Sequence, residues 1–244
     1  MRLFGLVGYP LSHSFSKKYF DEKFVQQGIT NCSFENFSIE NISLLQNILD
    51  DTNLNGLAIT IPYKKAVLHF LDESSDAVKQ MGACNCIKIK DGKRYGFNTD
   101  VIGFEKSFSK HLLPQHKQAL ILGTGGAAAA VEFVMKKLNI PYQFVSRKKD
   151  ANGKVFVYEE LNETVLSNHQ IIINCSPIGT YPKVDEAPAI PYQFINQQHY
   201  FFDLVYNPAE TKFLQLAKQQ GAIVQNGYEM LVLQAEENWK IWNE

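Results

Sequence analysis

The sequence contains little cysteine: four residues in a chain of 244, namely Cys32, Cys84, Cys86 and Cys175. Four cysteines are too few for a disulfide scaffold. Cys84 and Cys86 would share one face of a strand, but no second pair of cysteine or histidine follows at ligand spacing, and structural zinc needs four ligands. We therefore expect no metal, and reduced cysteines as in the cytoplasm.

The sequence also lacks an excess of either charge and any long apolar run. It has 24 lysine and arginine residues against 25 aspartate and glutamate residues, a net charge of -1. An electrostatic nucleic-acid binder needs a basic excess to neutralise phosphates, so none is expected. The longest apolar run, Ala119–Val131, is too short to cross a bilayer. Pro10 and the polar residues after it do not resemble a signal peptide. These absences predict a cytoplasmic protein without membrane or nucleic-acid partners.

What is present is an alternation of strand-like and helix-like segments. Hydrophobic residues make up 45% and charged residues 20% of the chain, as in a soluble globular protein. The length allows one large domain or two small ones. Residues 84–98 predict a β-hairpin around Asp91-Gly92, and Tyr63–Leu71 predicts a helix after Pro62. The second half alternates strands and helices more regularly, which predicts an α/β fold with a parallel, doubly wound sheet.

A glycine-rich turn opens the second half of the chain. Residues 119–122 predict a strand that runs into GTGGAA at 123–128 and then into a helix. In that context, Gly123 allows the tight turn, Gly125 allows the backbone to approach a pyrophosphate, and Ala128 allows close helix–strand packing. The helix start would offer N–H groups to the phosphates. A tight turn without a ligand is the alternative, and the context favours a nucleotide.

The next predicted strand indicates which dinucleotide would bind. NAD-binding domains place an acidic residue about 20 residues after the glycines, on the ribose 2′-hydroxyl. Here Ser146 is followed by Arg147, Lys148 and Lys149, and the first carboxylate is Asp150. Cations suit a 2′-phosphate, which arginine can grip with two hydrogen bonds. The pattern predicts NADP rather than NAD, although Lys148 and Lys149 also fit solvated charges in a turn.

Polar clusters in the first half follow predicted strands, where α/β sheets bind ligands. Ser14 and Ser16 lie between the first strand and its helix; each alone is typical of a helix N-cap, and together they suit an anionic ligand. Lys64 comes just past another strand. A single lysine there is usually solvated surface. The remaining clusters are GACN at 82–85 and GFNTD at 96–100.

Taken together, these segments resemble the shikimate dehydrogenase family. The resemblance runs from Gly8 to Trp239 through GYPLSHSFS, GLAITIPYK, GACNC, GFNTDVIGF, LGTGGAAAA, NCSPIGT, DLVYNPAETKFL and NGYEMLVLQA. It implies an NADPH-dependent reduction of 3-dehydroshikimate to shikimate, in aromatic amino-acid biosynthesis. No single segment is decisive, but eight in the same order are specific.

The resemblance also implies roles for individual residues. Lys64 and Asp100 would form the catalytic pair, with Lys64 passing a proton to or from the reacting oxygen. That role fits the chemistry, because a cationic donor stabilises the negative charge that develops on a reduced carbonyl oxygen. The residues that would hold the substrate are Ser14, Ser16, Thr60, Asn85, Asp100, Tyr206 and Gln234. The residues that would hold the cofactor are Gly123, Gly125, Gly126, Ala127, Arg147 and Gly227.

The chain departs from the family pattern at several places. The family usually has Asn at the position of Ala58, Thr at that of Cys86 and Met at that of Thr180. Lys17 replaces a usual Pro, and the strand end at 146–148 replaces Asn-Arg-Thr while keeping the arginine. None of these departures removes a residue of the catalytic pair.

The motifs divide the chain unevenly. Residues 1–100 are expected to form an α/β domain with a mostly parallel sheet that binds substrate, with the helix at 227–244 packing back on it. Residues 101–226 are expected to form a doubly wound, Rossmann-type NADP domain. We expect a monomer or homodimer. Three alternatives stay open: a quinate or quinate/shikimate dehydrogenase, a ligand-binding relative without activity, and a redox or metal protein using Cys84 and Cys86.

Overall fold

The computed structural model describes residues 1–11, 15–150 and 155–244. These form two compact units, one of Met1–Thr99 with Ala235–Glu244 and one of Asp100–Gln234. The sequence-based division starts the returning segment at residue 227, whereas the compact units part inside the last helix, after Gln234. The first part of this helix packs closely within the second unit: a Cβ built on Gly103 would lie only 2.5 Å from the backbone oxygen of Met230.

The sheet of the first unit is mixed, with the strand order β2-β1-β3-β5-β6-β4. β1 pairs in parallel with β2 and β3, whereas β5 runs antiparallel to β3 and β6. The predicted hairpin is present, and its turn residues Asp91 and Gly92 both have positive φ. The strands are β1 Arg2–Gly8, β2 Cys32–Ser38, β3 Leu54–Ile59, β4 Glu73–Ser74, β5 Cys86–Lys90 and β6 Lys93–Phe97.

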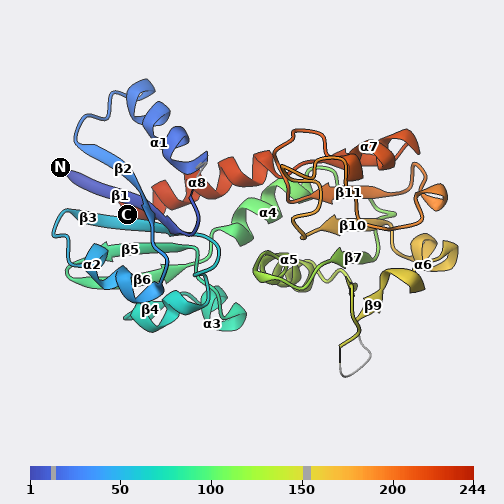
Figure 1. The fold of residues 1–244 in the computed structure, drawn as a ribbon, viewed down its shortest axis with the longest axis horizontal. Coiled ribbons are helices and arrows are strands. Elements are labelled where there is room, and N and C mark those ends of the chain that lie inside the picture. The colour runs from blue at the N-terminus through green and yellow to red at the C-terminus, as the bar shows by residue number, and fades with distance from the viewer. Residues whose placement is uncertain (12–14, 151–154) are drawn as a thin grey trace. The chain divides into compact units, whose positions relative to one another are not determined.

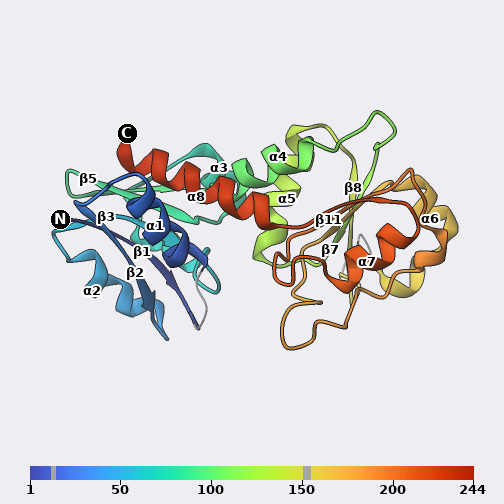
Figure 2. The ribbon, with the colours of Figure 1, turned by 90° about the horizontal axis from the view of Figure 1, so that it is seen from above.

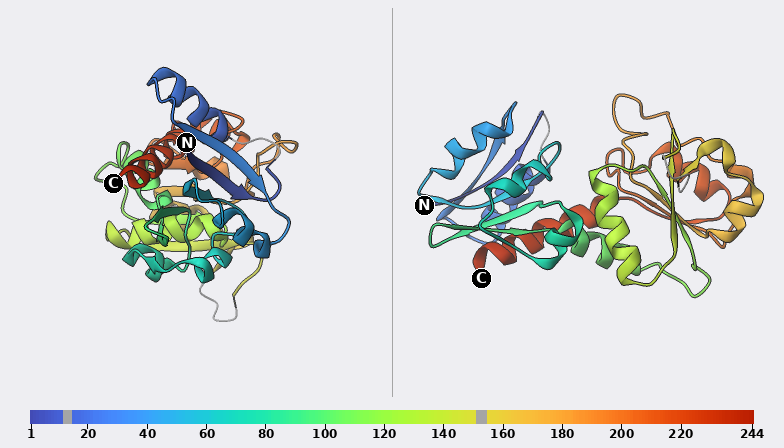
Figure 3. Two further views of the ribbon diagram at one scale, coloured as in Figure 1. Left: turned by 90° about the vertical axis from the view of Figure 1, so that its left-hand side faces the viewer. Right: turned by 90° about the horizontal axis from the view of Figure 1, so that it is seen from below.

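Helices cover both faces of this sheet (Figure 1). On one face, Phe20 of α1 and Trp242 of α8 pack with Phe4 of β1 in one buried cluster. On the other face, Leu45 of α2 and Val78 of α3 belong to a second cluster. Both termini lie in this unit (Figure 3), where Arg2 Nη1 donates to the side chain of Asn243 at 2.7 Å. The helices are α1 Phe15–Gln26, η1 Ile42–Leu44, α2 Leu45–Leu49, η2 Ala66–Phe70, α3 Asp76–Met81 and α8 Tyr228–Asn243.

The sheet of the second unit is parallel throughout, with the order β12-β11-β10-β7-β8-β9. Numbered within the unit, this order is 3-2-1-4-5-6 when read from β9, which is the Rossmann arrangement. Its strand order reverses between β7 and β10, and ligands bind such sheets beyond the carboxyl ends of the strands at that point. The strands are β7 Ala119–Leu122, β8 Tyr142–Ser146, β9 Phe156–Val157, β10 Ile171–Asn174, β11 Tyr200–Asp203 and β12 Ile223–Gln225.

Successive aromatic side chains of β11 pack against helices on opposite faces of this sheet. Phe202 packs edge-on against Phe104 of α4, with ring centroids 5.1 Å apart, whereas the adjacent Phe201 packs against Phe213 of α7 at 4.9 Å. Figure 2 shows α5 and α7 on opposite sides of these strands. The helices are α4 Asp100–Ser109, α5 Gly126–Lys137, η3 Tyr158–Glu160, α6 Glu163–Asn168, η4 Tyr192–Phe194 and α7 Lys212–Gln219. The two α/β units confirm the predicted fold class.

One predicted element is wrong in type. Tyr63–Leu71 is a run of turns that leads into the 3-10 helix η2. The Lys64 carbonyl accepts the N–H of Cys84 at 2.8 Å, a bond to a distant segment in place of a helical one. The Leu68 N–H then bonds to Lys65 at 3.3 Å, which is 3-10 geometry. Across the described ranges, every helix falls short of the length and apolarity that a membrane span requires.

Candidate active site

A cavity of about 310 Å³ lies at the strand-order reversal of the second unit. It opens beside the glycine turn after β7 and is bordered by residues that follow β8 and β10. Its lining residues are Gly123, Thr124, Gly125, Ser146, Arg147, Tyr158, Cys175, Ser176, Pro177 and Ile178. Gly126 and Ala127 begin α5 directly after this lining.

The glycine turn has the geometry that a bound pyrophosphate requires. Gly123 has φ +106°, a conformation that side chains disfavour, and its N–H donates to Val145 at 2.8 Å. A Cβ built on Gly125 or Gly126 would meet no protein atom within 4 Å, so these glycines leave the start of α5 open. α5 is 12 residues long, and its first N–H groups are available to an anion. The residues present therefore fit a dinucleotide.

Fewer cations are available to a ligand beside the cavity than the sequence predicts. Lys149 forms an ion pair with Glu160 at 2.5 Å, and this bond lowers the pKa of Glu160. Among the described residues, Arg147 and Lys148 have no such carboxylate partner. Arg147 lies near Tyr158, where its charge opposes the burial that raises the pKa of the phenol. Of the three cations, Arg147 alone lines the described cavity, beside Ser146 and Tyr158.

The predicted substrate residues of the first unit cluster at the ends of β3 and β5. Thr60 follows β3 and donates its N–H to Val7 at 2.9 Å. Ile59 N–H bonds to the Asn85 carbonyl at 2.8 Å, and the Lys64 carbonyl bonds to Cys84. The structure therefore brings Thr60, Lys64 and Asn85 together through backbone hydrogen bonds.

Two predicted residues of the first unit remain, Ser14 and Ser16. Ser16 is buried in the first turn of α1. Ser14 lies outside the described residues.

The remaining predicted residues belong to the second unit. Asp100 is the first residue of α4, and Gln234 is buried in α8, where its Nε2 donates to Leu231 at 3.1 Å. Tyr206 follows β11, and burial raises its pKa. Gly227 donates its N–H to Val205 at 3.2 Å, and a Cβ there would lie 2.2 Å from the Leu204 oxygen. This crossing of two backbones requires glycine.

The cysteine thiols do not form an activated site. Burial raises the pKa of Cys86 and of Cys175 well above the usual range, so both are protonated at neutral pH. Cys84 is buried and donates to the Cys86 carbonyl at 3.3 Å. In the described part of the chain, no three histidine, cysteine or acidic side chains gather as metal ligands would.

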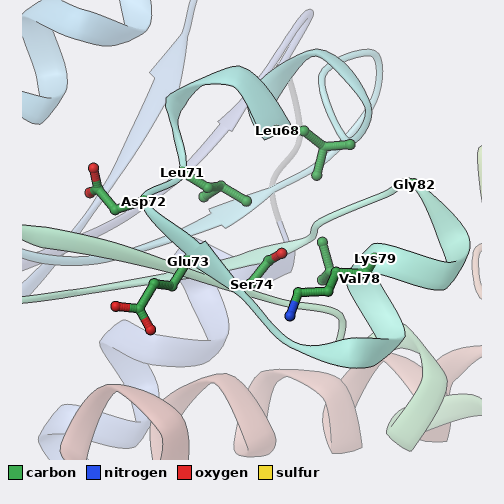
Figure 4. Close-up of a pocket in the computed structure, with 8 residues that line it drawn as sticks. All are labelled: Leu68, Leu71, Asp72, Glu73, Ser74, Val78, Lys79 and Gly82. Atoms are coloured by element: carbon green, nitrogen blue, oxygen red, sulfur yellow. The ribbon is translucent and has the colours of Figure 1, made fainter.

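A second cavity, of about 420 Å³, lies in the first unit between η2 and α3 (Figure 4). Its acidic residues are already paired: Asp72 binds Arg94 with two hydrogen bonds, at 2.9 and 3.0 Å, and Glu73 binds Lys93 at 3.3 Å. Arg94 lowers the pKa of Asp72 to about 2. None of the predicted site residues lines this cavity.

Several residues that line the cavity or hold neighbouring segments were not predicted from the sequence. Tyr158 and Ser176 line the cofactor cavity, although only their places after strands could have pointed to them. Thr99 lies within the quoted GFNTD motif, but its bond to Asn238 of α8 joins distant segments. Asp203 lies within DLVYNPAETKFL, where a strand end could have singled it out.

The strand order, the open glycine turn and the adjoining cavity define a class. The protein is a two-unit α/β protein with a dinucleotide-binding domain, as nicotinamide-dependent dehydrogenases have. Residues 6–87 match the model of the shikimate dehydrogenase substrate binding domain. The shikimate dehydrogenase (NADP(+)) of Clostridium beijerinckii is 37% identical over 259 residues, covering 100% of this chain and 93% of the relative. The chain belongs to the shikimate dehydrogenase family.

Solved structures agree with this assignment. The crystal structure of shikimate dehydrogenase from Aquifex aeolicus has a TM-score of 0.85 and 31% identity, covering 100% of this chain and 92% of that one. Shikimate 5-dehydrogenase from Thermus thermophilus, solved with NADP(H) and shikimate, has a TM-score of 0.86 and 26% identity, covering 99% and 93%. The family resemblance predicted from the sequence is confirmed.

Proposed function

We propose that this protein catalyses the reversible, NADPH-dependent reduction of 3-dehydroshikimate to shikimate. The observation that carries the proposal is the cavity at the β7–α5 turn, with its open glycines and Arg147, in a chain that relatives named shikimate dehydrogenase (NADP(+)) match from end to end. The proposed substrate is a small molecule.

The cofactor would lie along the glycine turn. Gly123, Gly125, Gly126 and Ala127 would bind its pyrophosphate, and Arg147 its 2′-phosphate. When bound, the reduced nicotinamide supplies the hydride. Tyr206 and Gly227 would border the nicotinamide and the substrate. The hydrogen bond from the Gly227 N–H to the Val205 carbonyl supports this placement, because it holds the two loops together.

The substrate would be held largely by hydrogen bonds. Ser14 and Ser16 would bind its carboxylate; Thr60, Asn85, Asp100 and Gln234 would bind its hydroxyl groups and ring. Lys64 would donate a proton to the carbonyl oxygen as hydride reaches the carbon, and Asp100 would hold the lysine cation in place. In the reverse direction Lys64 would take the hydroxyl proton.

The decisive experiment follows NADPH absorbance with 3-dehydroshikimate in the wild type, Lys64→Ala and Lys65→Ala. Lys65 is an exposed neighbour and serves as the matched control. We expect Lys64→Ala to lose about 10²–10⁴-fold in kcat with little change in KM, as for removal of a general acid. Lys65→Ala should keep wild-type rates.

Other outcomes point to the alternatives. Full activity in Lys64→Ala would remove this residue from the mechanism. Faster turnover with quinate and NAD than with shikimate and NADP would assign the broader enzyme. Shikimate binding without turnover would assign a ligand-binding role.

We also expect the protein to act in the cytoplasm as a monomer or homodimer. The four cysteines are free, which fits a reducing compartment. Cell fractionation and sedimentation test these two points.

A further inference from the structure

The carboxylate of Asp203, at the end of β11, is fully buried and accepts three hydrogen bonds. Asn174 Nδ2 donates at 2.9 Å, the Val205 N–H at 3.0 Å and Thr211 Oγ1 at 2.5 Å. Asn174 ends β10, Val205 lies in the loop after β11, and Thr211 is the N-cap of α7. One buried group therefore joins three backbone segments.

Asn174 extends this connection to the cofactor cavity. Its Oδ1 accepts the N–H of Ser176 at 3.0 Å and the hydroxyl of Ser176 at 2.6 Å. Ser176, Pro177 and Ile178 form a wall of the cavity that the glycine turn also lines. The wall is thus tied to Asp203 through two successive hydrogen bonds.

The loop after β11 is held by the same carboxylate. Val205 donates to Asp203 and accepts from the N–H of Gly227. Tyr206 follows Val205 directly. The loop that carries Tyr206 and the turn at Gly227 are therefore fixed relative to the end of β11.

We propose that Asp203 is a positioning residue for the cofactor: its carboxylate sets the shape of the cavity wall at residues 176–178 and of the loop at residues 204–211. The inference rests on the proposed function, because it takes NADP(H) as the ligand. Asp203 itself does not line the cavity. It acts through Asn174 on one side and Val205 on the other.

The cost of this arrangement supports a role beyond space filling. Burial raises the pKa of Asp203 to about 6, although its three hydrogen bonds act in the opposite direction. The ionised side chain is therefore poorly compensated at neutral pH, and an uncharged residue would fill the same volume at lower cost. What only a carboxylate provides is acceptor capacity for three donors from three segments.

The test compares Asp203→Asn with Tyr200→Phe in the full chain. Tyr200 lies at the opposite end of the same strand, and its buried hydroxyl donates to Gln225 at 2.7 Å, so Tyr200→Phe also deletes a buried hydrogen bond. NADPH fluorescence titration gives Kd, steady-state assays give KM for each substrate, and thermal melting gives stability. We expect Asp203→Asn to raise the Kd and KM for NADPH about tenfold or more, with a much smaller change in KM for 3-dehydroshikimate.

Tyr200→Phe should lower the melting temperature while leaving NADPH binding within about twofold of the wild type. Equal NADPH affinity in the two variants would overturn the positioning role. If the wild type itself binds no NADPH, the proposed function fails first. If Asp203→Asn does not fold, Asn174→Ala cuts the connection between Asp203 and Ser176; unchanged NADPH affinity there would equally overturn the role.

A second variant tests the mechanism of positioning. The double variant Asn174→Asp with Asp203→Asn exchanges the two side chains. The amide at position 203 can then donate to the carboxylate at position 174, which still accepts from Ser176. We expect the double variant to recover part of the NADPH affinity that Asp203→Asn loses. A double variant no better than Asp203→Asn would contradict the Asp203–Asn174–Ser176 connection.

Discussion

Thr99 Oγ1 donates to Asn238 Oδ1 at 2.7 Å, a bond between residues 139 positions apart. On its other side, Thr99 meets the side chain of Asn85: the Thr99 N–H donates to Asn85 Oδ1 at 2.6 Å, and Asn85 Nδ2 donates to Thr99 Oγ1 at 3.1 Å. All three side chains are buried. Helix α8 thereby fixes the orientation of a proposed substrate residue.

Asn238→Ala should weaken substrate binding through this network. The Thr99 hydroxyl would lose its shorter hydrogen bond in a buried site and keep only Asn85 Oδ1 as an acceptor, at 3.2 Å, which costs about 1 kcal/mol of stability. Asn85 would lose its fixed partner, so we expect KM for shikimate to rise several-fold while KM for NADP stays unchanged. Steady-state kinetics with each substrate varied separately measure both.

Ser107→Ala is the control for a general loss of stability. The Ser107 hydroxyl is buried in α4 and donates to Gly103 at 2.8 Å. It should destabilise the protein without changing KM for shikimate. Equal shikimate KM values in Asn238→Ala and wild type would show that the network does not hold Asn85 for binding.

Arg147 and Lys149 should differ in their effect on cofactor choice. Lys149 is already paired with Glu160, so Lys149→Ala should change KM for NADPH by less than about twofold. Arg147 lines the cavity, and loss of a charge-assisted pair to the 2′-phosphate should raise KM for NADPH about 10–100-fold. KM for NADH, which lacks that phosphate, should barely move. An equal rise for both cofactors in Arg147→Ala would contradict a 2′-phosphate contact.

The fold of the second unit could be predicted closely because its signals are local. The strand predicted at residues 119–122 has those same bounds in the structure. The first unit was harder, because distant contacts decide its local structure. The bond from Cys84 to the Lys64 carbonyl, 20 positions away, replaces the predicted helix.

The site shows the same division. The glycine turn is visible in sequence because its chemistry needs adjacent small residues. The pairing of Lys149 with Glu160 joins segments that no periodicity connects, so three adjacent cations suggested more free charge than the cavity has. The networks at Asp203 and Thr99 likewise depend on side chains from separate elements.

Two departures from the family pattern lie opposite one another. Ala58 of β3 pairs with Cys86 of β5 in antiparallel register, and both are buried in the cluster with Trp242. The family's usual Asn and Thr would place two polar side chains there, about 5 Å apart between their Cβ atoms. The apolar pair of this chain is therefore a matched replacement.

This pairing predicts strong coupling between the two positions. Ala58→Asn alone should cost about 1–3 kcal/mol, because its buried amide would lack a partner. Ala58→Asn with Cys86→Thr should cost less than the sum of the single changes, since the two polar groups can bond each other. Urea denaturation of the four proteins gives the coupling energy. Strict additivity would mean that the two departures are independent.

His116 is buried in the second unit, where its ring stacks on Tyr200 at the start of β11 with ring centroids 5.6 Å apart. Its Nδ1 accepts the Leu113 N–H at 2.9 Å, as a neutral imidazole can. Burial lowers its pKa, the charge on His199 adds to the lowering, and the Gln198 backbone opposes it. The folded state therefore binds a proton at His116 less readily than the unfolded chain does.

This difference predicts that His116 makes the protein less stable as the pH falls below about 6.5. Above that pH, both states are neutral at this residue and it contributes no slope; below the folded pKa, both are protonated and the slope ends again. Asp203 acts with the opposite sign, because its raised pKa means that protonation near pH 6 favours the folded state.

Melting temperatures of wild type and His116→Gln from pH 8 to pH 5 separate the effect of His116 from that of Asp203. The variant should lose less stability on acidification, while His69→Gln, at an exposed position, should follow the wild type. Parallel curves for wild type and His116→Gln would show that His116 binds protons equally well in the folded and unfolded states.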